Sequence, residues 1–153
     1  NLWRKSCMDK GLIEPVDIST QSGRIVLLTL TNTGHNIIGD NPTVNKRHGG
    51  IIHEYWKHHY ASYYEKQGYH VEKEYPLGDG KSVDIVAEKD DQKIAIEIET
   101  GRSNIWSNID KCLQFSIPQI IIIATNKNTG ANAKEIIKKY YSNSKAKIFL
   151  EVK

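Results

Sequence analysis

The segment from Gln119 to Ala124, QIIIIA, is the sequence feature that most constrains how this chain can fold. A strand with one face in water alternates polar and apolar residues, whereas an unbroken apolar run is typical of a strand buried on both faces. Such a strand lies in the centre of a sheet, beside a parallel neighbour. The segment therefore predicts an α/β protein in which helices cover a sheet.

The residues on either side of this segment show helix and strand patterns in blocks. Gly68 closes a helical pattern, Asp90, Asp91 and Gln92 form a turn between two strand-like segments, and Ser103 is placed to cap a helix. We expect helices over 51–67, 103–115 and 131–141, and strands over 69–75, 82–88, 93–99, 119–124 and 146–152. The predicted order is α-β-β-β-α-β-α-β.

A stretch rich in glycine, asparagine and basic residues, GDNPTVNKRHGG at 39–50, separates this domain from the start of the chain. We place a linker at 41–50, between a segment at 1–40 and a domain at 51–153. Because the sequence does not begin with methionine, we expect a fragment of a longer protein whose N-terminal region is missing.

The first 40 residues have a pattern of their own. A helix end over 2–10 is stopped by Gly11, and strands over 13–20 and 24–31 are joined by a Gln-Ser-Gly turn. Thr33 can cap a short helix after them. This order resembles the last third of a winged-helix domain, in which the tail of the recognition helix precedes the wing. A lone β-hairpin packed on the main domain is the alternative.

Composition sets broad limits on the setting and the partners. The net charge of +3 permits a nucleic-acid partner without requiring one. Two cysteines indicate no disulfide framework, and we expect a reducing, cytoplasmic location. The longest apolar run is too short to cross a bilayer, so no membrane partner is expected.

Three acids lie inside segments that otherwise have the pattern of buried strands. Alternate side chains of a strand share a face, so Glu97 and Glu99 point away from Ile96 and stand with Cα atoms about 6.6 Å apart. A hairpin can bring Asp84 next to Glu97. We therefore expect these three carboxylates to converge.

Close like charges repel, and a cation between them makes the arrangement favourable. Mg²⁺, or Mn²⁺ in its place, accepts two or three carboxylates together with water and a substrate phosphate. The alternative is an edge of the sheet in contact with solvent, where lysine or arginine neighbours neutralise the acids.

At these residues the chain resembles the PD-(D/E)XK nuclease superfamily, with Asp84 and the triplet Glu97-Ile98-Glu99 matching its motif. The resemblance spans Gly49 to about Ala124. It implies a restriction-endonuclease-like mixed β-sheet flanked by helices, with an α-β-β-β-α-β core. It also implies metal-dependent hydrolysis of DNA phosphodiester bonds, with Asp84 and Glu97 as metal ligands.

Two residues depart from the family pattern. Val83 stands in place of proline, which is a minor change, and Glu99 stands in place of the lysine that orients or deprotonates the attacking water. Glu99 could serve as a general base or as a further metal ligand. A lysine could instead come from Lys81 or Lys111.

The first helix of the domain adds two candidates. The resemblance implies an acid there, for which Glu54 is available, and His53 lies beside it. Both are candidate catalytic residues, with a surface glutamate as the alternative for Glu54. The aromatic side chains predict which face of this helix is packed: Tyr55, Trp56, His59 and Tyr63.

The function that these features favour is a Mg²⁺-dependent deoxyribonuclease domain. Five basic residues are candidates for holding DNA phosphates: Lys46, Arg47, Lys81, Arg102 and Lys111. The expected partners are DNA, a helicase, translocase or other DNA-processing domain, and a second copy of the chain. The alternative is a catalytically inactive nuclease-fold module that binds DNA. No motif supports a third hypothesis, a domain that binds a small nucleotide.

Overall fold

The structure, a computed structural model, describes residues 2–20, 23–39 and 50–153. The chain divides into two compact units between Ile52 and His53. The linker expected at 41–50, and with it Lys46 and Arg47, lies outside the described residues. Within the described ranges, no helix is long and apolar enough to span a membrane.

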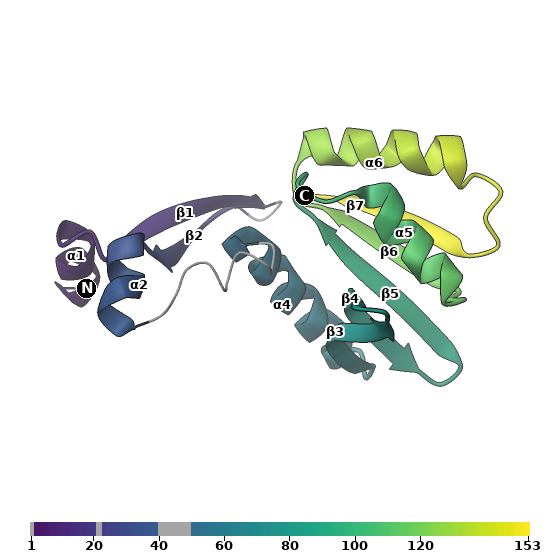
Figure 1. The fold of residues 1–153 in the computed structure, drawn as a ribbon, viewed down its shortest axis with the longest axis horizontal. Coiled ribbons are helices and arrows are strands. Elements are labelled where there is room, and N and C mark those ends of the chain that lie inside the picture. Colours follow the sequence, from purple (N-terminus) through teal and green to yellow (C-terminus); the bar gives the residue numbers. More distant parts are fainter. Residues whose placement is uncertain (1, 21–22, 40–49) are drawn as a thin grey trace. The chain divides into compact units, whose positions relative to one another are not determined.

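The N-terminal unit contains two helices and a two-stranded hairpin (Figure 1). Its elements are α1 (Leu2–Asp9), β1 (Ile13–Thr20), β2 (Gly23–Leu30) and α2 (Asn32–Ile38). These agree with the sequence prediction to within about a residue, but the predicted cap is wrong. Thr31, with extended backbone, caps α2 by accepting a hydrogen bond from Gly34 N at 3.1 Å, so Thr33 already lies inside the helix.

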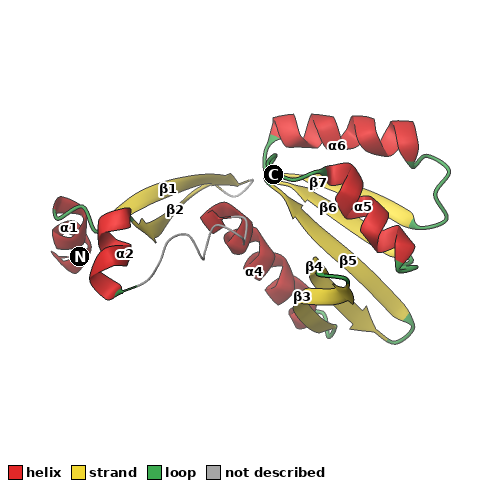
Figure 2. Cartoon of the chain, viewed as in Figure 1, coloured by secondary structure: helices red, strands yellow, loops and turns green. Residues whose placement is uncertain are grey.

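The C-terminal unit follows the predicted order of helices and strands (Figure 2). Its elements are α4 (Gly50–Lys66, which begins just before the division), β3 (His70–Gly78), β4 (Lys81–Lys89), β5 (Gln92–Glu99), α5 (Ile105–Gln114), β6 (Gln119–Ala124), α6 (Lys127–Tyr140) and β7 (Lys147–Val152). Two helix starts differ from prediction because asparagines cap them: Asn104 caps α5 in place of Ser103, and Asn126 starts α6 before Ala131.

The five strands form one mixed sheet in the order β3-β4-β5-β6-β7. β3, β4 and β5 are antiparallel neighbours, whereas β6 is parallel to both β5 and β7. The apolar segment from Gln119 to Ala124 is therefore an inner strand with parallel neighbours, as its sequence predicts. The chain is an α/β protein.

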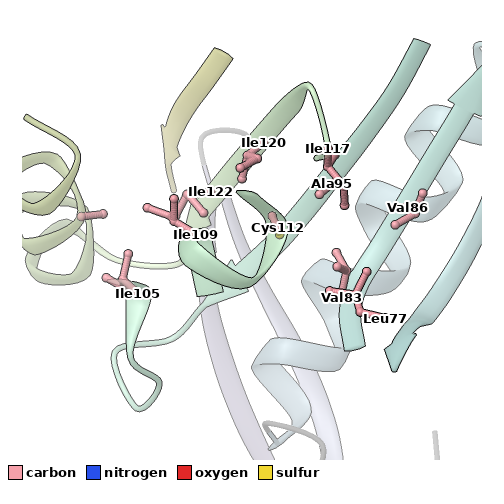
Figure 3. Packing of buried hydrophobic residues seen from close by; sticks show 11 residues of the cluster. Leu77, Val83, Val86, Ala95, Ile105, Ile109, Cys112, Ile117, Ile120 and Ile122 are labelled. Carbon is pink, nitrogen blue, oxygen red and sulfur yellow. The ribbon is translucent and has the colours of Figure 1, made fainter. Parts of the chain in front are cut away.

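Helices lie on both faces of this sheet, α5 and α6 on one face and α4 on the other (Figure 1). Between the sheet and α5, apolar side chains form a continuous core: Ile105, Ile109 and Cys112 of α5 meet Ala95, Ile120 and Ile122 of the strands (Figure 3). These six side chains are at most 2% exposed. The core fixes α5 above β5, which is the strand that carries Glu97 and Glu99.

The buried face of α4 differs from the predicted one. Trp56 is buried as expected, but His59 and Tyr63 are exposed. The buried positions are His53, Trp56, Lys57, Tyr60 and Ala61, which recur at the helical spacing of three and four. The face that α4 turns inward therefore contains two basic side chains.

Candidate active site

Asp84 lies where the pairing of β4 with β5 ends. The last backbone pair of the two strands is Ile85 with Ile96, and Asp84 comes one residue beyond it. The amide of Ile98 donates to Asp84 Oδ2 at 2.8 Å. The carboxylate therefore satisfies a β5 backbone donor at the point where the ladder stops, and this fixes its position beside Glu97.

Glu97 is buried in the same region, with 1% of its surface exposed. The Lys111 ammonium lies 3.0 Å from Glu97 Oε1, and the Cys112 thiol contacts the same oxygen at 3.9 Å. Burial and then the charge of Asp84 raise the pKa of Glu97 well above its ordinary value, against the opposing effect of Lys111. The alternative of a solvent-exposed edge is wrong for this residue, although a lysine does pair with it.

Glu99 is fully buried, and protein groups occupy both of its carboxylate oxygens. Asn108 Nδ2 donates to Oε1 at 2.7 Å, and the Ser103 hydroxyl donates to Oε2. Burial raises the pKa of Glu99, while these two hydrogen bonds and Lys111 oppose the rise. Asp84 also raises it, so Asp84, Glu97 and Glu99 influence one another as expected from the strand period.

His53 reaches this group from α4. Its Nε2 atom lies 3.0 Å from Asp84 Oδ2, and its Nδ1 atom lies 3.5 Å from Glu54 Oε1. Burial lowers the pKa of His53, but the hydrogen bond and charge of Asp84 outweigh that effect and the pKa is raised. The structure thus brings the histidine predicted beside Glu54 into direct contact with Asp84.

Lys57 and Glu74 are not among the residues predicted from the sequence. The Lys57 ammonium lies 2.6 Å from Glu54 Oε1 and 2.5 Å from Glu74 Oε1, with its side chain 5% exposed. Glu74 lies on β3 between Lys73, which pairs with Ile85, and Tyr75, which pairs with Val83. Its φ of 51° is in the left-handed region. The spacing of His53 and Lys57 on one helical face was the available signal. Nothing in the sequence indicated that the backbone of Glu74 adopts a left-handed conformation.

The carboxylates of Asp84 and Glu97 are the type of donor that a divalent ion such as Mg²⁺ takes. Among the residues described, no group of three or more His, Cys, Asp or Glu side chains is arranged to hold a metal ion. Asp84 and Glu97 each use one oxygen, Oδ2 and Oε1, for the contacts given above. Mg²⁺ commonly takes one or two carboxylates and completes its shell with water and phosphate. Both Glu99 oxygens already accept a protein hydrogen bond, so Glu99 is the least available of the three carboxylates as a ligand.

The basic residues predicted to bind DNA occupy different environments. Lys111 is paired with Glu97, and Lys81 donates to Gln114 Oε1 at 3.3 Å. Arg102 is exposed in the connection between β5 and α5. Of these three, Lys111 is the one that the structure brings to the carboxylates.

No protein-family model matches the chain, and a search of curated proteins gives no match.

Proposed function

We propose that residues 53–153 form a Mg²⁺- or Mn²⁺-dependent DNA endonuclease domain with a restriction-endonuclease-like fold of the PD-(D/E)XK type. The observation that carries the proposal is the placement of Asp84 beside the buried Glu97, with Lys111 and His53 in contact with them. The order α4-β3-β4-β5-α5-β6 also supports it, because the resemblance implies an α-β-β-β-α-β core.

Asp84 and Glu97 would hold the ion, which when bound polarises the scissile phosphate and activates water. The Ile98 amide and His53 orient the Asp84 carboxylate from two directions. Lys111 supplies a cation beside Glu97, where the strand itself has Glu99 instead of lysine. In this proposal the ammonium of Lys111 faces the DNA phosphate once the ion binds Glu97.

Plasmid nicking in the presence of Mg²⁺ or Mn²⁺ tests this function. The parent protein is expected to nick, and Glu97→Gln, which keeps the side-chain shape, is expected to lose activity by about 10²-fold or more. Glu88→Gln is the matched control, because Glu88 lies on β4 and pairs with Lys93 instead. Equal nicking by the parent and Glu97→Gln would contradict the proposal.

A specific observation favours a second candidate, an inactive nuclease-fold module that binds DNA. Asp84 contacts His53 and Glu97 contacts Lys111, so each carboxylate already has a protein partner that can carry positive charge and part of its charge is compensated without an ion. Calorimetric titration with Mn²⁺ separates the two candidates. Binding that Glu97→Gln abolishes supports the endonuclease, whereas DNA binding without any Mn²⁺ binding supports the module.

For either candidate we propose DNA as the partner, together with a helicase, translocase or other DNA-processing domain. In the endonuclease, Lys81 and Arg102 would contact phosphates that flank the scissile bond.

A further inference from the structure

Glu99 makes contacts that differ from those of a ligand or a proton acceptor. Both donors to its carboxylate, Ser103 and Asn108, come from the connection before α5 and the first turns of that helix. The residue is fully buried, and its backbone carbonyl accepts from the amide of Thr125 at 2.9 Å. Through its side chain and its backbone, Glu99 therefore connects β5 with the start of α5 and with Thr125, the residue that follows β6.

The contacts of Glu97 and Glu99 form a matched pair between β5 and α5. Glu97 and Glu99 share one face of the strand, about 6.6 Å apart. Asn108 and Lys111 are three residues apart on α5 and so share one face of the helix. Glu99 meets Asn108, and Glu97 meets Lys111. Two contacts of this kind set both the rotation of α5 and its position along β5.

Each Glu99 oxygen already accepts one protein hydrogen bond, from Asn108 or from Ser103, so an ion or a water molecule bound there would have to share that oxygen or displace the donor. Displacement would leave the Asn108 amide without this acceptor in a partly buried site, which is unfavourable. We propose that Glu99 is a positioning residue, which anchors α5 through Ser103 and Asn108 so that the Lys111 ammonium stays at Glu97. The consequence for cleavage rests on the proposed function, whereas the placement of Lys111 does not.

Substitutions at Glu99 separate anchoring from chemistry that needs a carboxylate. In Glu99→Gln the amide oxygen can still accept from Asn108, and the amide nitrogen can donate to the Ser103 hydroxyl, so both contacts survive without charge. Glu99→Ala removes both contacts. Asn108→Ala removes one of them from the other side and leaves the carboxylate intact.

Chemical labelling of lysines with acetic anhydride, read by mass spectrometry, follows Lys111 without any need for activity. Its ammonium is expected to stay protected in the parent and in Glu99→Gln, and to become several-fold more reactive in Glu99→Ala and Asn108→Ala. Lys57, also buried and ion-paired but on α4, is the control and is expected to stay protected in all four proteins. Unchanged protection of Lys111 in Glu99→Ala would overturn the proposal. A gain in reactivity at Lys57 equal to that at Lys111 would also overturn it, because the effect would then be general unfolding and not a displacement of α5.

Mn²⁺ titration and cleavage kinetics give the second readout. Glu99→Gln is expected to keep the Mn²⁺ stoichiometry, KM and kcat of the parent, while Glu99→Ala and Asn108→Ala lower kcat by about 10²-fold through misplacement of Lys111. An equal loss of kcat in Glu99→Gln and Glu99→Ala would overturn the anchoring role. It would indicate instead that Glu99 acts as a metal ligand or as a general base. If the parent neither binds Mn²⁺ nor cleaves DNA, the proposed function fails, and the labelling of Lys111 still decides the role of Glu99.

Discussion

At the scale of single residues, the carboxylates near the candidate site differ in how well protein groups compensate them. Glu99 receives two hydrogen bonds, whereas Glu97, at 1% exposure, has the Lys111 ammonium and a weak thiol contact. A buried charge with incomplete compensation opposes folding. Keeping Glu97 ionised therefore costs stability.

Glu97→Gln is expected to raise the free energy of unfolding near pH 7, because the amide puts no charge in the buried site. The pKa of Glu97 is raised well above its ordinary value of 4.5 in the folded state, so the folded protein loses stability as pH rises from about 4.5 towards that higher value. Below about pH 4 the parent carries a neutral carboxyl, and the gain should vanish. Urea unfolding of the parent and the variant at both pH values measures this gain in stability. A variant that is less stable than the parent near pH 7 would contradict the prediction and would mean that Lys111 compensates the charge of Glu97 fully.

Lys57 gives a second prediction at this scale, since its buried ammonium depends on two glutamates. Glu54→Gln and Glu74→Gln are each expected to cost about 1 kcal/mol, because one carboxylate remains. The double variant leaves the Lys57 ammonium without either glutamate. Its loss of unfolding free energy should therefore exceed the sum of the two single losses by about 1 kcal/mol or more. Urea unfolding of the singles, the double and an exposed control, Glu65→Gln, measures this. If the loss in the double variant equals the sum of the two single losses, the Lys57 ammonium must be solvated by water when both glutamates are replaced.

At the scale of elements, periodicity predicts strands well and the packed face of a helix less well. The two-residue period placed Glu97 and Glu99 on one face of β5, because a strand offers only two faces. A helix offers more, and the aromatic side chains of α4 suggested a face that included His59 and Tyr63. The buried face is instead set by the pairing of His53 with Asp84 and of Lys57 with Glu74. Those partners are distant in sequence, so local patterns do not contain this information.

Helix caps show the same limit, and they provide the prediction at this scale. Thr31 and Thr33 are the same residue type two positions apart, but only Thr31 has the extended backbone of a cap and accepts from Gly34 N. Thr31→Ala is expected to destabilise α2 by about 1 kcal/mol, and Thr33→Ala by a few tenths. Hydrogen exchange of the α2 amides measures both. Equal protection in the two variants would contradict the capping role of Thr31.

At the scale of the whole molecule, the sequence predicted the order and pattern of the strands in the second unit. It did not predict the network of charges, because His53, Glu74, Asp84 and Lys111 come from four separate elements that only the tertiary fold brings together. The N-terminal unit has no comparable cluster in its described residues. Its clearest ion pair joins Arg24 Nη2 to Asp17 Oδ2 at 2.6 Å across the hairpin.

The roles proposed for the two units give the last prediction. Deleting residues 1–39 is expected to weaken DNA binding and flatten its salt dependence, without changing the Mn²⁺ affinity or the cleavage rate of bound DNA. Each lost phosphate contact reduces the magnitude of the negative slope of log K against log salt by about 0.9. Because Asp17 holds the Arg24 guanidinium in a two-point contact, Asp17→Asn should free that charge and strengthen binding in the full chain. Fluorescence anisotropy of a labelled duplex at several salt concentrations measures both variants. Unchanged affinity in both would favour a plain hairpin over a wing, and a lost cleavage rate after deletion would assign the first unit a part in the chemistry.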